Sequence, residues 1–161
     1  YDKDLDLTFT GAIDDLWFNE DSKKVIVVDY KATSKEGEIT LSDDGWWPQY
    51  KRQMEFYQFL LRMNEMNVEN YGFFLYANGI KKGFFNKQVK FNLYLIKYEG
   101  DTSWIPGTLK DLKSTLDEEN VPEPSKNCDY CRYFEDRQDS FRRLNYGQNM
   151  NLFDRYTLMK N

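Results

Sequence analysis

The sequence predicts an α/β domain in which a mixed β-sheet of about four strands is flanked by helices. The first observation behind this prediction is that short runs rich in β-branched and aromatic residues are interspersed with longer stretches whose apolar residues recur every three or four positions. The second is the expected element order β-β-α-β-β-α-α, in which helices follow strands closely enough to pack on the sheet.

The four expected strands cover residues 5–19, 25–31, 71–78 and 89–98. The first alternates apolar and polar side chains, which is typical of a strand with one buried face. The second, VIVVDYK, opens with an uninterrupted apolar run, so we expect it to be buried on both faces. The last two are rich in aromatic residues and are joined by GIKKGFFNK.

Three helices are expected at residues 46–66, 106–119 and 128–144. In the first helix, Met54, Tyr57 and Leu61 recur at spacings of three and four and therefore share one face. The second begins with a proline in its first turn, where proline is tolerated. The stretch between the second strand and the first helix is expected to be a long surface loop.

Composition indicates one small globular domain, and we expect residues 1–161 to form it. A net charge of −5 argues against a general polyanion binder but leaves room for a locally basic groove. Two cysteines are too few for a disulfide framework. No stretch reaches the roughly 18 apolar residues of a membrane span. We therefore expect an intracellular, cytoplasmic protein with no membrane partner.

Two carboxylates and an amine are expected to meet on one face of the first hairpin. If the chain turns at residues 21–22, Asp14 and Asp29 lie directly opposite each other with Cβ atoms about 5 Å apart. Lys31 emerges on the same face about 7 Å further along the strand. A shift of one residue in this register would instead bring Asp15 nearest to Asp29.

Facing carboxylates repel each other, so this arrangement favours a cation bound between them. Together with the backbone carbonyl of Tyr30, Asp14 and Asp29 offer hard oxygen ligands that suit Mg²⁺ or Mn²⁺. Such an ion polarises a phosphate and lowers the pKa of a bound water, while Lys31 can orient that water and share the negative charge. The alternative is an acidic pair that is merely solvated at the end of a strand.

Three motifs resemble the PD-(D/E)XK nuclease superfamily in its RecB-like exonuclease branch. The segment GAID ends at Asp14, and the segment DYK runs from Asp29 to Lys31 at the end of the next strand. Gln53 and Tyr57 match a Gln-x-x-x-Tyr element on the following helix, where positions four apart lie on one face. Each motif alone is weak, but all three in this order on the expected elements are considerably more specific.

The resemblance implies a restriction-endonuclease-like core in which Asp14 and Asp29 bind the metal and Lys31 is catalytic. Gln53 and Tyr57 would support the site or contact the nucleic acid, and the alternative for them is ordinary helix packing. The family's core usually begins with a helix that carries an acidic or histidine side chain. This chain starts almost at the first strand and contains no histidine, so we expect that helix to lie upstream or to be replaced by another segment.

Residues 122–145 carry a Cys-x-x-Cys pair, Cys128 and Cys131. This segment resembles the carboxy-terminal cysteine cluster of AddB-type and CRISPR-adaptation nucleases, which hold an iron–sulfur cluster. With two cysteines and no histidine, neither a four-thiolate iron–sulfur cluster nor a zinc site can be assembled from this chain alone. The pair is then a relic, a site completed by residues outside this sequence, a redox-sensitive pair, or two small residues packed on a helix.

These observations favour a Mg²⁺- or Mn²⁺-dependent deoxyribonuclease, acting as an exonuclease on DNA strands or ends in repair, recombination or phage- or CRISPR-related processing. A helicase or another processing protein is the expected partner. One alternative is a nuclease fold that binds nucleic acid or a protein without cutting, and another is a cysteine-based redox or metal protein. Trp46 and Trp47 are candidates to cover the site or to stack on a base, and the alternative for them is packing at the start of the helix, which is more usual for tryptophans there. For the candidate phosphate contacts the alternative is a solvated surface charge, which is more usual for any single one; they are Lys51, Arg52, Lys81, Lys82, Lys87, Arg132, Arg142 and Arg143.

Overall fold

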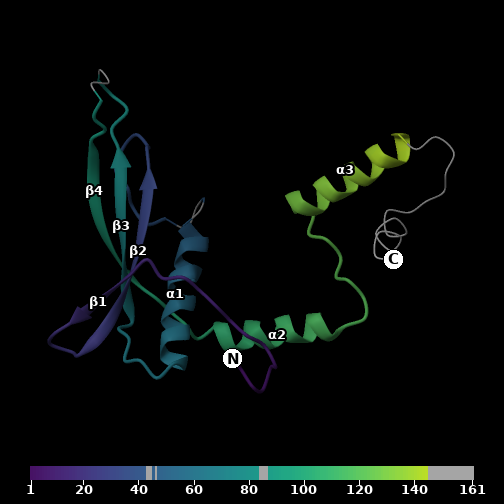
Figure 1. Cartoon of the computed structure of the whole chain (residues 1–161), viewed down its shortest axis with the longest axis horizontal. Helices are drawn as coiled ribbons and strands as arrows, with labels where there is room; N and C mark the ends of the chain where they lie inside the picture. The colour runs from purple at the N-terminus through teal and green to yellow at the C-terminus, as the bar shows by residue number, and fades with distance from the viewer. Residues whose placement is uncertain (43–44, 46, 84–86, 145–161) are drawn as a thin grey trace. The chain divides into compact units, whose positions relative to one another are not determined.

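The computed structural model describes residues 1–42, 45, 47–83 and 87–144, with side chains up to residue 138. The chain divides into two compact units, Tyr1–Asp117 and Glu118–Asn161. The described elements are shown in Figure 1. In chain order they are β1 Asp15–Asn19, β2 Lys24–Thr33, α1 Trp47–Met63, β3 Tyr71–Gly79, β4 Phe91–Glu99, α2 Ile105–Asp117 and α3 Asp129–Leu144.

The strands form one mixed sheet in the order β1-β2-β3-β4. β1 pairs with β2, and β3 with β4, in antiparallel orientation, whereas β2 and β3 are parallel. A parallel pair cannot be closed by a tight turn, so the connection that contains α1 serves as the crossover between β2 and β3. The predicted α/β fold with a mixed sheet of about four strands is confirmed.

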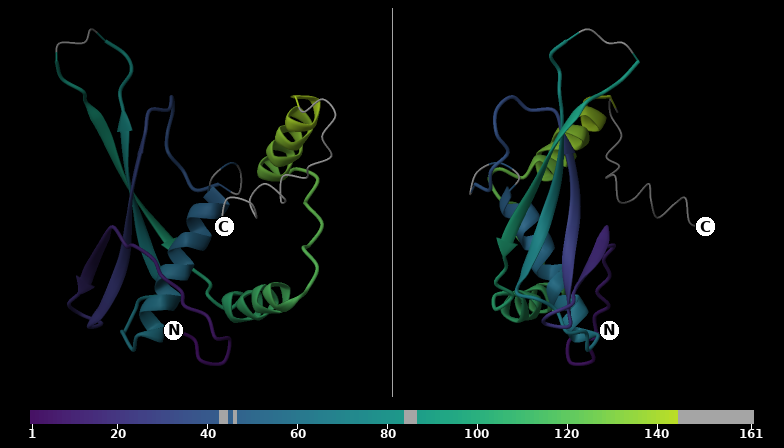
Figure 2. Two further views of the ribbon diagram at one scale, coloured as in Figure 1. Left: turned by 45° about the vertical axis from the view of Figure 1, so that its right-hand side comes forward. Right: turned by 90° about the vertical axis from the view of Figure 1, so that its left-hand side faces the viewer.

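Helix α1 packs on one face of the sheet, as both views in Figure 2 show. The close approach depends on Gly72 of β3. A Cβ at this position would lie 2.8 Å from the backbone carbonyl oxygen of Val27 and would collide with the side chain of Met54. Helix α1 therefore lies directly against the two central strands. The buried residues of this face are Val27, Ile39, Trp47, Met54, Tyr57, Val68, Phe74 and Tyr76.

A buried carboxylate fixes the start of α2 to α1. Glu55 is 6% exposed and accepts hydrogen bonds from the Tyr98 hydroxyl at 2.5 Å, the Trp104 indole at 2.7 Å and the Asp101 backbone N–H at 3.1 Å. A buried charge is tolerated when several donors satisfy it, as they do here. The segment that leads from β4 into α2 is anchored as a result.

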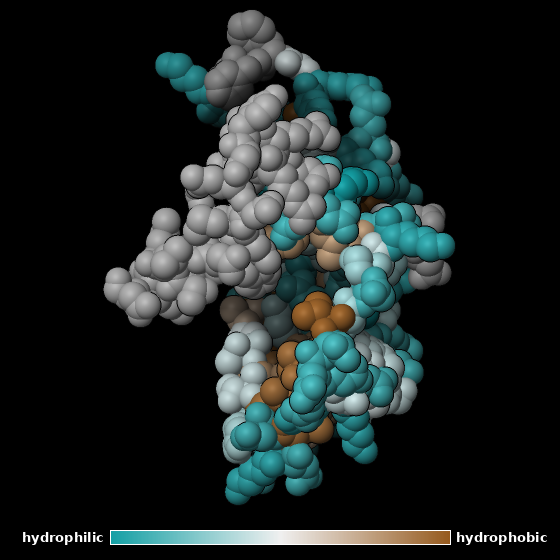
Figure 3. Space-filling view, turned by 90° about the vertical axis from the view of Figure 1, so that its right-hand side faces the viewer, coloured by the Kyte–Doolittle hydropathy of each residue, from teal (hydrophilic) through white to brown (hydrophobic). Residues whose placement is uncertain are grey.

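The leucines of helix α2 continue the face that Ile105 begins, at spacings of three and four, but this face is buried only in the first half of the helix. Ile105 and Leu109 are buried, whereas Leu112 and Leu116 are 44% and 61% exposed. In the lower part of Figure 3, where α2 lies, apolar surface is visible between polar side chains.

The strand expected over residues 5–19 is confined to β1, so the prediction of its start is wrong. Upstream of β1 the chain leaves the sheet and passes over α1. The rings of Phe9 and Phe56 meet edge to face with centroids 6.1 Å apart, and Ile13 packs against the core. The alternating apolar residues of this segment therefore serve contacts with the helix and the core rather than pairing with a strand.

Helix α1 ends at Met63 and not at residue 66 as expected. Glu65 adopts a left-handed backbone conformation with φ of 62°. The N–H groups of Glu65 and Met66 donate to the carbonyls of Arg62 and Leu61 at 2.9 and 3.1 Å. This pair of hydrogen bonds is the Schellman motif, which satisfies the last carbonyls of a helix and stops it.

The second unit contains α3. The helix expected at residues 128–144 is confirmed, and it begins one residue later, at Asp129. Three aromatic residues of this helix, Tyr130, Tyr133 and Phe134, are exposed. Within the residues that the structure describes, no helix combines the length and apolar character needed to span a membrane.

Candidate active site

The hairpin of β1 and β2 brings Asp14 and Asp29 opposite each other. Asp15 pairs with Val28, and this register places Asp14 across from Asp29 one residue further along, as the sequence predicts. Oδ2 of Asp14 accepts a hydrogen bond from the backbone N–H of Tyr30 at 2.8 Å. Because a strand residue directs its N–H and C=O toward the same neighbour, the Tyr30 carbonyl faces the β1 side as well.

Asp15 belongs to the other face of the hairpin. Its carboxylate accepts hydrogen bonds from the Tyr30 hydroxyl and, at 3.1 Å, from the Trp17 indole. These two donors lower the pKa of Asp15. The alternative register, in which Asp15 would replace Asp14 opposite Asp29, is therefore wrong.

Asp29 is a buried carboxylate whose charge is only partly compensated. It is 3% exposed and forms an ion pair with the Lys31 ammonium. Beyond that ion pair, its Oδ2 has no hydrogen-bond partner among the described residues. Burial raises the pKa of Asp29, the Lys31 ammonium lowers it, and the Asp14 charge raises it again, with a net upward shift. A cation beside Asp14 and Asp29 would supply the missing compensation.

Lys31 is held by three groups that fix its direction. Besides the ion pair with Asp29, its Nζ donates to Oε1 of Gln53 at 3.2 Å and lies 4.6 Å from the centroid of the Tyr50 ring. Gln53 in turn donates from Nε2 to the Tyr57 hydroxyl at 2.9 Å. The structure thus joins the DYK segment of β2 to the Gln-x-x-x-Tyr element of α1 in one connected network.

The glycine of the GAID segment lies against the same network. A Cβ at Gly11 would lie 2.9 Å from Cε1 and 3.2 Å from Cδ1 of the Tyr57 ring. Glycine therefore lets the chain pass close to α1 before it reaches Asp14. The two ends of this short motif serve one site, since Gly11 packs on Tyr57 and Asp14 faces β2.

Two tyrosines of this site were missed by sequence reasoning. The Tyr50 ring lies beneath the Lys31 ammonium, a cation–π arrangement. Tyr76 of β3 pairs with Lys31 in the parallel register, and its pKa rises to about 12 because it is buried and lies near Tyr50 and Asp29. Tyr50 precedes Gln53 by three positions, so its place on the helix face was a usable signal. The register of β3 carries no comparable signal in the sequence.

Trp47 packs in the core, which confirms the packing alternative for this tryptophan and excludes it as a residue that stacks on a base. It is 8% exposed, and its ring lies 5.7 Å from that of Phe74 and 5.2 Å from that of Tyr76 between centroids. Trp46 lies outside the described residues, as do the side chains of Arg142 and Arg143.

The donor set suits a hard divalent cation, although it is small. Within the described residues, no group of three or more His, Cys, Asp or Glu side chains could hold a metal ion. Asp14 and Asp29 supply two carboxylates, and the Tyr30 carbonyl faces the same side. Mg²⁺ commonly keeps several waters and binds through one or two carboxylates, so this set fits a partly hydrated ion. The exposed side chain of Asp14 leaves the site open to solvent.

The two cysteines lie at the start of α3 in the second unit, and both are free thiols. Sγ of Cys128 accepts a hydrogen bond from the backbone N–H of Cys131 at 3.4 Å, as an N-cap side chain does. Hydrogen bonding from the Cys131 thiol lowers the pKa of Cys128, and the same contact raises the pKa of Cys131. Cys128 therefore has a structural role at the start of the helix, where its sulfur caps the backbone N–H of position 131.

One comparison with known proteins identifies the family. No curated protein and no solved structure gives a significant match to the chain. A sequence model of the PD-(D/E)XK nuclease superfamily matches residues 1–135, which include the whole sheet and the network around Lys31. Members of this superfamily generally use divalent metal ions. Since the match covers most of the sequence, the chain belongs to the PD-(D/E)XK nuclease superfamily.

Proposed function

We propose that the chain is a divalent-metal-dependent nuclease that hydrolyses phosphodiester bonds of DNA, in the RecB-like exonuclease branch of its superfamily. The observation that supports this most is the buried carboxylate of Asp29, which lies opposite Asp14 and beside the Lys31 ammonium. The superfamily supports a nucleic-acid substrate. Gln53 and Tyr57, which match the RecB-like helix element and support Lys31, favour the branch.

In this proposal Asp14, Asp29 and the Tyr30 carbonyl hold Mg²⁺ or Mn²⁺. When bound, the ion would neutralise phosphate charge and make a water more acidic. Lys31 orients the attacking water and donates to the negative charge that develops on the phosphate. Because Lys31 pairs with Asp29 and also donates to Gln53, its ammonium is already held beside the carboxylate before a strand arrives, which reduces the reorganisation that the reaction requires.

We place this activity in DNA repair, recombination or phage- or CRISPR-related processing inside the cell. A helicase or another processing protein would deliver the DNA strand. Action at strand ends is the expected mode, and the polarity of digestion would follow from the partner that feeds the strand.

A cleavage assay tests the proposal. End-labelled linear DNA is incubated with Mg²⁺, Mn²⁺ or EDTA and with wild type, Asp29→Asn, Lys31→Met or Asp15→Asn. We expect metal-dependent cleavage that falls at least about a hundredfold in the first two variants. Asp15→Asn is the matched control, because its carboxylate belongs to the other face of the hairpin, and it should cleave like wild type. Cleavage that survives both Asp29→Asn and Lys31→Met would contradict the proposal.

A second candidate is a nuclease fold that binds nucleic acid without cutting it. It is favoured by the small donor set, since no third acidic, thiol or imidazole side chain joins Asp14 and Asp29 among the described residues. This candidate predicts DNA binding by wild type with no metal-dependent cleavage, and binding that is unchanged in Lys31→Met. The same assay, combined with a binding measurement, separates the two.

A further inference from the structure

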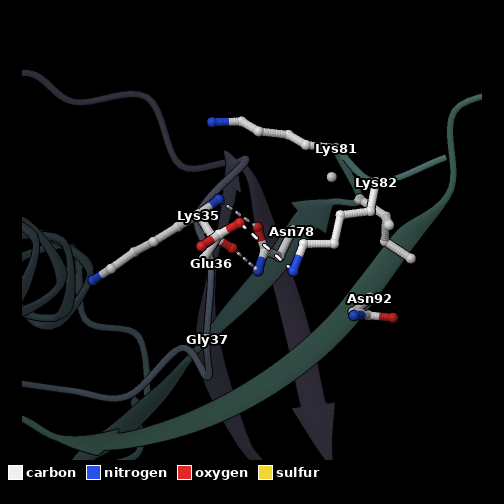
Figure 4. A pocket seen from close by; sticks show the side chains of 9 residues that line it. Lys35, Glu36, Gly37, Asn78, Lys81, Lys82 and Asn92 are labelled. Carbon is white, nitrogen blue, oxygen red and sulfur yellow. Dashed lines mark hydrogen bonds and ion pairs between the residues drawn. The ribbon is translucent and has the colours of Figure 1, made fainter.

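A cluster of lysines lines a hollow at one end of the sheet, in a chain whose net charge is −5. The hollow lies where β2 and β3 end, and its described lining comes from the segment that follows β2, from the end of β3 and from β4. We call it the lysine hollow and define it by Lys35, Lys81 and Lys82. Figure 4 shows Asn78 near its centre, with the Lys35 and Lys81 ammonium groups extending away from it.

A buried amide builds the floor of the lysine hollow. Asn78 is 5% exposed, and its Oδ1 accepts from the backbone N–H of Lys35 at 2.9 Å while its Nδ2 donates to the Lys35 carbonyl at 3.0 Å. The Ser34 hydroxyl adds a third hydrogen bond, to the carbonyl of Gly79 at 2.8 Å. Two hydrogen bonds thus fix the backbone of Lys35 to Asn78, and a third fixes the neighbouring Ser34 to the end of β3, so the position from which the Lys35 side chain projects is set by the sheet.

The lysine hollow lies on the same face of the sheet as the candidate active site. Side chains alternate along a strand, so Asp29, Lys31 and Thr33 of β2 share one face, and Lys35 follows two residues after this strand ends. Thr33 pairs with Asn78, which lies on the α1 face. From Lys31 to Lys35 the chain spans at most about 13 Å, a distance that a DNA strand covers within a few nucleotides.

The charge of the lysine hollow is weakly neutralised by the protein. Glu36 is the one carboxylate among the described residues that line it, and its Oε1 lies 3.8 Å from Nζ of Lys82. Both side chains are more than four-fifths exposed, at 82% and 86%. An exposed ion pair of this length contributes little, so a phosphate can replace the carboxylate at Lys82.

We propose that the lysine hollow binds the phosphates of a DNA strand that runs from the candidate active site along the same face of the sheet. This inference deepens the proposed function and rests on it for the identity of the polyanion. The lysines add affinity and position the strand a few nucleotides from the scissile bond, because phosphate contacts position a strand without reading its sequence. The negative charge elsewhere on the chain directs the strand to this face.

Binding measured without cleavage tests the proposal. The whole chain is titrated, in EDTA, against a fluorescently labelled single-stranded DNA oligonucleotide at several salt concentrations, and anisotropy gives the affinity. The test variant is the triple replacement Lys35→Gln, Lys81→Gln and Lys82→Gln. The matched control is Lys3→Gln, Lys23→Gln and Lys110→Gln, which removes the same charge from exposed lysines outside the hollow. Thermal unfolding checks that both triple variants remain folded.

We expect the test variant to bind at least about tenfold more weakly at low salt, and its slope of log K against log salt to be shallower by about 2. The control should keep the wild-type slope. Equal slopes and affinities in test variant and wild type would overturn the lysine hollow as a DNA contact, whatever the cleavage assay shows. If the wild type binds DNA, the lysine replacements weaken that binding and the wild type never cleaves, the DNA contact is supported and the nuclease activity is overturned. Failure of the lysine hollow and failure of the proposed function are therefore distinguishable.

Discussion

Replacing Lys31 by methionine should destabilise the protein more than replacing Asp29 by asparagine. The reason is that each change leaves one member of the ion pair behind, and Lys31 keeps other interaction partners whereas the Oδ2 atom of Asp29 does not. In Lys31→Met, the Asp29 carboxylate stays buried and its Oδ2 loses its one described partner. In Asp29→Asn, the ammonium still has Oε1 of Gln53 and the Tyr50 ring, and its side chain is 16% exposed. The ion pair is therefore asymmetric.

The magnitudes follow from this asymmetry. Removing one member of a buried ion pair costs about 3–5 kcal/mol when the other is left uncompensated. Lys31→Met should lie near 3 kcal/mol, since the raised pKa of Asp29 lets its carboxyl take up a proton. Asp29→Asn should cost about 1–2 kcal/mol, because the remaining partners of Lys31 compensate part of its charge. The double variant should cost less than the sum of the two.

The pH dependence of Lys31→Met has a definite sign. Because the pKa of Asp29 is raised on folding, the stability that its protonated form contributes is present below the unfolded pKa and lost as pH rises through the folded pKa. Lys31 is the group that lowers this pKa, so its removal shifts the loss to higher pH. The deficit of Lys31→Met relative to wild type should therefore shrink in mild acid.

Urea unfolding followed by tryptophan fluorescence, in EDTA and in neutral and mildly acidic buffer, measures all four proteins of this cycle. Asp15→Asn controls for the removal of a carboxylate on the other face of the hairpin. A Lys31→Met variant no less stable than Asp29→Asn would refute this reasoning. Strict additivity of the two changes would refute it as well.

Three further predictions concern the fold and the cysteines. Gly72→Ala should lower the free energy of unfolding by about 1–3 kcal/mol, since its Cβ meets the backbone of β2, and an unchanged melting temperature would contradict this. Glu55→Gln turns an amide donor toward the Trp104 indole and should cost about 1–3 kcal/mol in urea unfolding. Part of that loss should return in Glu55→Gln/Trp104→Phe, and no recovery would count against the contact. Near neutral pH, iodoacetamide should modify Cys128 before Cys131, because the pKa of Cys128 is lowered, and equal rates by mass spectrometry would exclude this order.

The arrangement of the carboxylates could be predicted because it depends on local geometry. A short turn and the period-two alternation of two strands fix which residues face each other, so the sequence places Asp14 across from Asp29. Gln53 and Tyr57 follow from the helical period in the same way. Each of these relations involves residues within one hairpin or one helix.

The remaining parts of the site depend on contacts that no local pattern encodes. Tyr76 and Asn78 reach β2 through a parallel pairing whose register is set by the packing of the whole sheet. The segment around Phe9 alternates like a strand, yet Phe9 packs on Phe56 of α1, because a helix surface and a sheet surface bury the same side chains. Sequence reasoning therefore extended the first strand too far and missed the residues beside Lys31 on β3.

Manganese binding tests the central claim most directly, because it needs no substrate. Isothermal titration of the whole chain with Mn²⁺ compares wild type with Asp14→Asn and with the neighbouring control Asp15→Asn. We expect wild type and Asp15→Asn to bind the ion alike and Asp14→Asn to lose at least about tenfold in affinity, since it gives up one of two carboxylate ligands. Equal binding by all three proteins would show that the facing carboxylates of the hairpin do not hold a metal.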